Sequence, residues 1–455
     1  MELKIVSRMN IKPSCPTPSN LRIFKLSLLD QLIPQPYAPI VLFYLPNDNN
    51  YSDHCDQNDI SNRLESLRKS LSSTLTRFYP LAGKFKDQLS IECNDEGANY
   101  VETQAVGFSL RQFLSHPGPD LLLVNKLLPC QLGSTELNLT GAYVANIQVN
   151  VFDCGGIALG LCIAHKILDG VALSTFIKSW AAEAQGFDNP TGPNFVAGSL
   201  FPADDSLWLS DCSKAMFGSL FSKGKSITKR FVFNSSSISI LKSQSASSDV
   251  ENPTRVEAVS GFLWRCFVTA CKEKNGVVIR PSLLNHIVNL RRRTTPYLPE
   301  NSIGNLVWMG VAKSDGVEVD QTQLVSLVRE STARIDDDFV KRMMRGEEGK
   351  FWMMKWVDEI GELGCSEGVD YMGVSSWCRI GFYEADFGWG RPIWVSSFCL
   401  SGYSMVISLV ILVDTRSGDG IEAWVSLDED DMAIVECNTQ LLQLAQVDPS
   451  PLELD

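Results

Sequence analysis

The residue best suited to proton transfer in this chain is His165, one of only four histidines among 455 residues. It follows an alternating run from Ile157 to Ala164 in which every second residue is Ile or Leu. Side chains of a β-strand alternate between its two faces, so His165 shares the buried face with these apolar residues. A strand end is a common place for a scaffold to present a side chain to a cleft. The pattern therefore predicts an imidazole, the side chain that titrates near neutral pH, at the end of a buried strand.

Asp169 lies four residues after this histidine and is followed by Gly170. A carboxylate near an imidazole can fix the protonated ring nitrogen, or it can hold the turn by pairing with an arginine. The apolar spacing from Gly170 to Ala184 predicts a helix, which makes Asp169 a candidate N-cap as well. The spacing His-x-x-x-Asp also arises by chance in a chain of this composition. A core histidine beside a helix-capping aspartate therefore stays open as the alternative.

Other signatures of catalysis are missing from the sequence. There is no Gly-x-Ser-x-Gly elbow and no histidine pair at metal-ligand spacing. The turn Asp386-Phe-Gly-Trp-Gly390 lacks the third glycine of a dinucleotide-binding loop. Of the other histidines, His54 and His116 fall in polar turns and His286 in an apolar run, as expected for two solvated side chains and one core side chain. We therefore expect no metal site and no covalent nucleophile.

The composition is that of an ordinary globular protein, with 44% hydrophobic residues and a net charge of −13. This charge argues against nucleic-acid binding and against adhesion to an anionic membrane. The thirteen cysteines contain no Cys-x-x-Cys pair, which favours scattered thiols in a reducing compartment. The start of the chain has no secretory pattern, and apolar runs such as 405–413 are too short to span a bilayer. We expect a cytoplasmic protein.

The elements needed to position the histidine are predicted on both sides of it. Residues 142–152 and 157–164 alternate around a Gly-Gly turn, which predicts a hairpin. A strand is expected at 39–45 and a helix at 59–78, and Thr254 to Glu257 has the spacing of a capping box. The stretch 186–229 is rich in Pro, Ser and Gly and reads as a linker. We predict a mixed α/β protein with domains at 1–200 and 226–455 and a linker at 201–225.

Two motifs taken together resemble one known family. His165-Lys-Ile-Leu-Asp169-Gly170 in mid-chain and Asp386-Phe-Gly-Trp-Gly390 further on, in this order, are similar to the BAHD family of acyl-CoA-dependent acyltransferases. The resemblance covers the whole chain, and its other matching segments include 14–18, 28–31, 78–83, 93–97, 288–291, 304–305 and 414–424. Within the family, the chain resembles acetyltransferases of plant alkaloid metabolism.

The resemblance implies two chloramphenicol-acetyltransferase-like domains joined by a long crossover loop, with a solvent channel between them. His165 would be the general base at the centre of this channel. Asp169 would point away from the channel and support the base structurally, by pairing with Arg291. Asp386 would maintain the shape of its loop and act on CoA binding only indirectly.

Further site residues are candidates with less specific support. For the oxyanion or the thioester these are Ser375, Trp377 and Asn305, where the chain has Ser-Ser-Trp in place of the family's common Thr-Ser-Trp. For the phosphates of CoA they are Thr254, Arg255 and Lys229, because helix N-termini and basic side chains favour phosphate. The expected co-substrate is acyl-CoA, with no permanently bound cofactor and no metal.

The activity expected from the resemblance is transfer of an acetyl group from acetyl-CoA to a hydroxyl of a plant alkaloid or terpenoid alcohol. His165 would deprotonate the alcohol, which then attacks the thioester directly. Three alternatives stay open: transfer of a larger acyl group, acylation of an amine, and a non-catalytic relative that binds a metabolite. The expected partners are acyl-CoA and a small alcohol, with neither nucleic acid nor membrane, and the expected state is a monomer.

Overall fold

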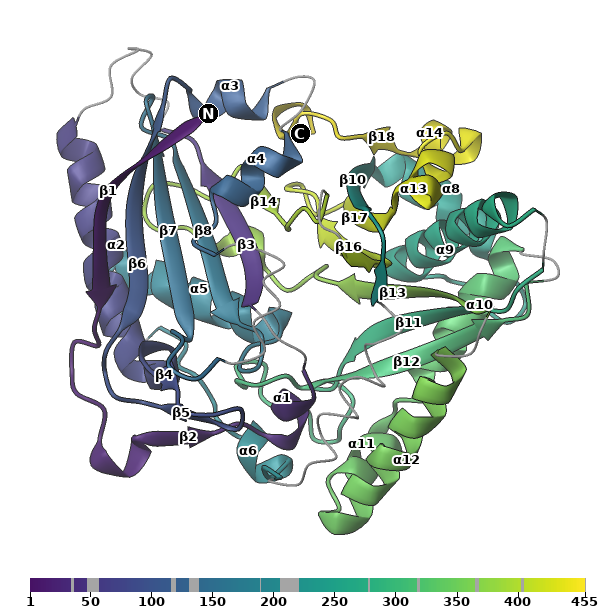
Figure 1. Ribbon diagram of the computed structural model, residues 1–455, viewed down its shortest axis with the longest axis horizontal. Helices are drawn as coiled ribbons and strands as arrows, with labels where there is room; N and C mark the ends of the chain where they lie inside the picture. The colour runs from purple at the N-terminus through teal and green to yellow at the C-terminus, as the bar shows by residue number, and fades with distance from the viewer. Residues whose placement is uncertain are drawn as a thin grey trace.

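The computed structural model describes residues 1–33, 37–46, 57–115, 120–130, 139–188, 190–204, 221–276, 279–316, 320–364, 368–401 and 405–454. Two lobes lie side by side, each built on a β-sheet with helices packed against it (Figure 1). The first sheet has the strand order β1-β6-β7-β8-β3-β14, and the second has the order β12-β11-β13-β16-β17-β10-β18. This mixed α/β architecture confirms the predicted fold class.

The first lobe contains most of the N-terminal half of the chain. Its sheet consists of β1 (Glu2–Ile11), β6 (Ala98–Val106), β7 (Ala145–Phe152), β8 (Ile157–Ala164), β3 (Tyr37–Tyr44) and β14 (Trp394–Ser396). Its helices are α1 (Leu28–Leu32), α2 (Gln57–Arg77), α3 (Leu110–Leu114), α4 (Leu121–Lys126), α5 (Gly170–Ala184) and α6 (Ala197–Leu200). A small sheet of β2 (Ile23–Lys25), β5 (Ser90–Glu92) and β4 (Lys84–Phe85) lies at one end. β7 and β8 pair antiparallel as the predicted hairpin.

The second lobe is built on the seven-stranded sheet. Its strands are β12 (Val307–Ser314), β11 (Ser282–Asn289), β13 (Asp370–Ser376), β16 (Leu409–Asp414), β17 (Ile421–Asp428), β10 (Ser226–Phe233) and β18 (Gln446–Val447). Its helices are α8 (Ser235–Ser245), α9 (Arg255–Lys274), α10 (Gln321–Ala333), α11 (Asp337–Met343), α12 (Glu347–Gly364), α13 (Glu429–Val435) and α14 (Thr439–Leu444). A separate pair, β9 (Phe221–Lys223) with β15 (Met405–Ile407), is antiparallel. His286 is buried in β11, as predicted for a core histidine.

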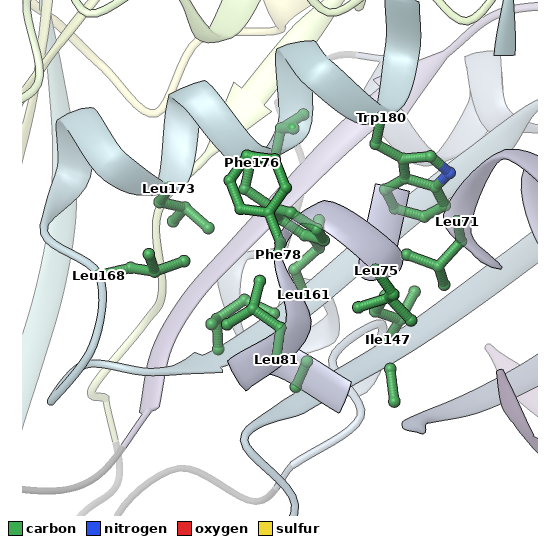
Figure 2. Close-up of a cluster of buried hydrophobic side chains, with 14 of the residues drawn as sticks. Leu71, Leu75, Phe78, Leu81, Ile147, Leu161, Leu168, Leu173, Phe176 and Trp180 are labelled. Carbon is green, nitrogen blue, oxygen red and sulfur yellow. The ribbon is translucent and has the colours of Figure 1, made fainter. Parts of the chain in front are cut away.

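The core of the first lobe holds the segment around the histidine in place. Every residue of β8 is buried, and α5 packs its apolar face against the sheet together with α2. Figure 2 shows this cluster, in which Phe176 and Trp180 of α5 meet Leu71 and Leu75 of α2. Because β8 and α5 are both anchored in this core, the five residues that connect them are held at both ends.

The lobes are joined by more than the linker, which corrects the simple division at residue 226. β14 comes late in the chain, yet it pairs antiparallel with β3 at the edge of the first sheet. Trp394 of β14 stacks on Phe43 of β3 at 5.0 Å and on Trp424 of β17 at 5.8 Å. An apolar core shared by both lobes therefore forms around these rings, and β14, from the predicted second domain, lies at the edge of the first sheet.

Some predictions concern residues outside the described ranges. These are the solvated positions of His54 and His116 and most of the predicted linker, residues 205–220. Among the residues that the structure describes, no helix is both long enough and apolar enough to cross a membrane.

Candidate active site

His165 lies directly after β8, and the residue is half-buried. Its Nδ1 atom is 3.1 Å from Oδ1 of Asn305, which comes from the second half of the chain. The isolated bridge between Leu168 and Gly304 brings the two segments together. The imidazole therefore stands where the two halves of the chain meet.

The orientation of the Asn305 amide fixes which nitrogen of His165 carries the proton. The Asn305 Nδ2 group donates to the backbone carbonyl of His165 at 2.7 Å and to Oδ1 of Asp30 at 2.9 Å. Both partners are acceptors, so the nitrogen must face them and Oδ1 must face the imidazole. An amide oxygen accepts only, hence the proton is on Nδ1 of His165. The lone pair of Nε2 is then available to take a proton from a substrate.

Asp30 holds this amide in place. The carboxylate is buried on α1, where it forms a capping box with Ser27, and its Oδ1 also accepts the backbone N–H of Asn305 at 2.6 Å. Burial raises the pKa of Asp30, and the hydrogen bonds from Ser27 and Asn305 act in the opposite direction. Three groups thus form a chain from Asp30 through Asn305 to His165.

Sequence reasoning did not identify Asp30 as a site residue. A signal was available, because Ser27 and Asp30 have the Ser-x-x-Asp spacing of a capping box before an apolar run. That spacing predicts a helix start, and nothing in it indicates a contact with a residue 275 positions away.

Asp169 stabilises the start of α5 and the contact with the second half of the chain. Its carboxylate caps α5 by accepting the N–H of Ala172 at 2.9 Å, and it forms a two-pronged ion pair with Arg291 at 2.7 and 3.1 Å. The N–H of Leu306 donates to it at 3.1 Å. Both carboxylate oxygens are therefore engaged, and the pairing with Arg291 is the one that the resemblance implied. The alternative that Asp169 caps the helix also agrees with the structure, since the two roles coexist.

Arg291 makes further contacts besides its ion pair with Asp169. Its side chain is fully buried, and it also donates to the carbonyls of Ser302 at 2.8 Å and Gly304 at 3.3 Å. These carbonyls lie one to three residues before Asn305. The ion pair thus fixes the loop that presents Asn305 to His165.

The loop of Asp386 packs on the first lobe. Oδ1 of Asp386 accepts the N–H groups of Gly388 at 2.8 Å and Gly390 at 3.0 Å, and both glycines have positive φ, which suits them to this tight turn. Phe387 makes an edge contact with Trp180 of α5 at 5.1 Å. Asp386 therefore shapes a loop that braces α5, the helix that Asp169 caps.

Ser375 and Trp377 lie at the end of β13. In the β-sheet, Ser375 is paired with Ile411, a residue of the core shared by both lobes. The Ser375 side chain therefore lies on the face of β13 opposite to Met372 and Val374, which pack in the core of the second lobe. The Trp377 ring lies beside Gly170, since a Cβ atom built there would be 3.7 Å from its Nε1. Trp377 therefore approaches the segment that follows His165, whereas Ser375 faces the core shared by both lobes.

Asn305 is less suited to the predicted role at the oxyanion. Its amide nitrogen already donates to His165 and Asp30, and its oxygen faces the imidazole. The structure gives it an orienting position instead, because an amide with both hydrogens engaged has none left for a new oxyanion.

The predicted CoA contacts all have partners within the protein. Thr254 caps α9 in the predicted capping box, and Arg255 pairs with Asp414 at 2.9 Å. Lys229 pairs with Glu436 at 3.2 Å. Each residue therefore stabilises its own surroundings, and a contact with CoA stays a prediction for all three.

Replacement of Asn305 by leucine is expected to lower kcat by about 10- to 100-fold. A hydrogen bond to a group that becomes charged contributes roughly 1.5–3 kcal/mol, and His165 would become charged in its predicted role as the base. KM for the acyl donor should change little. The measurement is steady-state kinetics, with Asn301→Leu as the control variant. Asn301 is a half-buried asparagine that donates to the Gly192 carbonyl. Equal losses in the two variants would contradict an orienting role for Asn305.

Comparisons with known proteins show a likeness over nearly the whole chain. A model of the Transferase family matches residues 1–442. The chain is 42% identical to epi-neemfruitin B 7-O-acetyltransferase of Melia azedarach, with 99% of this chain and 100% of the relative covered. It is 40% identical to limonoid 7-O-acetyltransferase of Citrus sinensis, with the same coverage. The crystal structure of vinorine synthase superimposes with a TM-score of 0.80 at 30% identity, covering 98% of this chain and 99% of that chain.

Proposed function

This chain belongs to the Transferase family, the BAHD acyl-CoA-dependent acyltransferases, and from that premise we propose that it transfers an acetyl group from acetyl-CoA to a hydroxyl of a plant specialised metabolite. The observation that carries the proposal is the half-buried His165, whose Nδ1 faces the oxygen of Asn305. A general base needs a free lone pair on the nitrogen that meets the substrate, and this contact provides one on Nε2.

The reaction follows from the groups at the site. Nε2 of His165 takes the proton of the acceptor hydroxyl while the hydroxyl oxygen attacks the thioester carbonyl. The tetrahedral oxyanion needs hydrogen-bond donors, and the candidates are the Trp377 indole, which lies beside Gly170, and the Ser375 hydroxyl, which faces the core shared by both lobes. When the intermediate collapses, the imidazolium gives its proton to the departing CoA thiolate. The enzyme needs no covalent intermediate of its own.

The acceptor that we propose is a polycyclic alcohol of the limonoid type. The support is the identity of 42% and 40%, over nearly the whole chain, to two plant 7-O-acetyltransferases, one of them named for limonoids. An alkaloid alcohol is the second candidate, since the resemblance found in the sequence was to alkaloid acetyltransferases. We place the enzyme in the cytoplasm as a monomer; the ten described cysteines, all free thiols, support a reducing compartment.

The proposal is tested with the purified full chain and a panel of substrates. Acetyl-, malonyl- and hydroxycinnamoyl-CoA are each incubated with a limonoid alcohol, an alkaloid alcohol and an aromatic amine, and the product masses are measured. The expected result is a mass gain of one acetyl group on an alcohol, fastest with the limonoid. Faster transfer of a larger acyl group, or transfer to the amine, would contradict the donor or the acceptor. The absence of any transfer would overturn the enzymatic function.

A further inference from the structure

Lys166 follows the catalytic base in the sequence, but its side chain is directed to the protein interior. Only 8% of the residue is exposed, and its Nζ donates to the backbone carbonyl of Gln31 at 3.1 Å. Transfer of an ammonium group out of water is costly, and burial lowers the pKa of Lys166 to about 8. A single carbonyl does not compensate for this cost. A nearby negative charge is therefore needed to stabilise the buried ammonium of Lys166.

That charge is on Asp30, the residue before Gln31. Its carboxylate is only 1% exposed and accepts N–H groups from Ser27 and Asn305. These donors favour the ionised form, because a protonated oxygen would lose part of its capacity to accept. The negative charge of Asp30 raises the pKa of Lys166, against the effect of burial. Coulombic attraction is mutual, so the ammonium of Lys166 acts against burial and in favour of the charged form of Asp30.

The other charged groups around this point are paired with one another. The Gln31 Oε1 atom accepts the N–H of Asp204, whose carboxylate pairs with Lys350. On the other side of Asn305, Asp169 is paired with Arg291. Asp30, in contrast, is the carboxylate whose charge acts on the buried ammonium of Lys166.

We propose that Lys166 is a positioning residue: its buried ammonium keeps Asp30 ionised, and Asp30 in turn holds the Asn305 amide so that the proton of His165 stays on Nδ1. This inference rests on the proposed function, in which Nε2 of His165 is the base. Lys166 itself touches neither substrate, so its effect reaches the reaction only through Asp30 and Asn305.

The first test compares the pH dependence of kcat in Lys166→Met, Lys166→Arg and the wild type. Without the ammonium, Asp30 should take up a proton at higher pH, because an opposite charge nearby lowers a carboxyl pKa by about 1–3 units. The acidic limb of the Lys166→Met profile is therefore expected to move upward by about one pH unit or more, with KM for acetyl-CoA unchanged. Lys166→Arg keeps the charge and should keep the limb closer to its wild-type position. Lys178→Met removes a half-exposed lysine, paired with Glu384, as the matched control.

The second test separates Asp30 from a direct effect on the imidazole. Histidines titrate between pH 5 and 8, so loss of a neighbouring cation could also move the limb through His165. The shift should vanish when Lys166→Met is made in the Asp30→Asn background, where no carboxyl remains to be protonated. A shift of equal size in both backgrounds, or an unmoved limb in a Lys166→Met protein with wild-type melting behaviour, would overturn the proposal.

A readout independent of turnover keeps this inference distinct from the proposed function. The nitrogen chemical shifts of ¹⁵N-labelled histidine report which ring nitrogen carries the proton, and the chain has only four histidines. The His165 signals, assigned with His165→Gln, should show protonated Nδ1 in the wild type and a mixture in Lys166→Met. An unchanged pattern would overturn the role of Lys166 even if acetyl transfer is found. The wild-type protein could also show the expected nitrogen chemical shifts and yet transfer no acetyl group. That result would contradict the proposed function but not the role of Lys166.

Discussion

Replacement of His165 by alanine is expected to lower kcat by about 10²- to 10⁴-fold, the usual contribution of a general base. The acceptor hydroxyl would then have to lose its proton to water, and the departing thiolate would have no proton donor. Binding of acetyl-CoA should be close to that of the wild type, because the proposed role of the imidazole is to move a proton and not to hold the donor. The measurements are kcat with a saturating acceptor and the dissociation constant of acetyl-CoA by calorimetry.

The other described histidine provides the control for this prediction. His286 is buried in β11, and its Nδ1 lies 3.1 Å from the backbone carbonyl of Ile287. His286→Gln should lower the melting temperature while kcat of the folded protein stays near the wild-type value. If His165→Ala kept the wild-type kcat, the mechanism would be wrong, since the proposed mechanism depends on this imidazole to take the proton.

Replacement of Arg291 by methionine is expected to destabilise the protein by about 3–5 kcal/mol, the usual cost of removing one partner of a buried ion pair. The carboxylate of Asp169 would be left in the interior without its counter-charge, and the carbonyls of Ser302 and Gly304 would lose a shared donor. The loop of Asn305 would loosen as a consequence. The measurement is the free energy of unfolding in urea, where the midpoint should fall markedly.

A neighbouring arginine gives the matched control. Arg292 is 71% exposed and pairs with Glu300 at the surface, so Arg292→Met should change stability very little. In Asp169→Asn/Arg291→Met, both charges are removed, and the double variant should be more stable than the sum of the single losses predicts. If Arg291→Met unfolded at the wild-type urea concentration but lost kcat, the pair would act in catalysis, and its structural assignment would be wrong.

Much of the fold around the base could be predicted from the sequence because the signals are local. The alternation that ends at His165 reflects a period of two residues, and the spacing that begins at Gly170 reflects a helical period; β8 and α5 have the predicted bounds. The capping box of Thr254 and Glu257 is present as expected. In each case, the residues that create the signal lie within a few positions of one another.

The lobe boundary could not be predicted in the same way. The aromatic-rich segment before β14, residues 375–393, carries ordinary turn and strand signals. None of these signals indicates the sheet that β14 joins. The preference for β3 arises from the fit of Trp394 between Phe43 and Trp424, three rings that are distant in the chain. Packing of this kind depends on shape in three dimensions, which a periodic pattern does not contain.

The sequence by itself determined the family and the strand and helix on either side of His165, and it predicted His165 as the base, because these depend on motifs and on periods of two to four residues. Only the tertiary structure decided which groups lie around that histidine. Asn305 lies 140 residues from His165, Asp30 lies 275 residues from Asn305, and Lys166 reaches a carbonyl 135 residues away. These side chains are selected by burial, since a charge or an amide removed from water must find its partner wherever the folded chain places one.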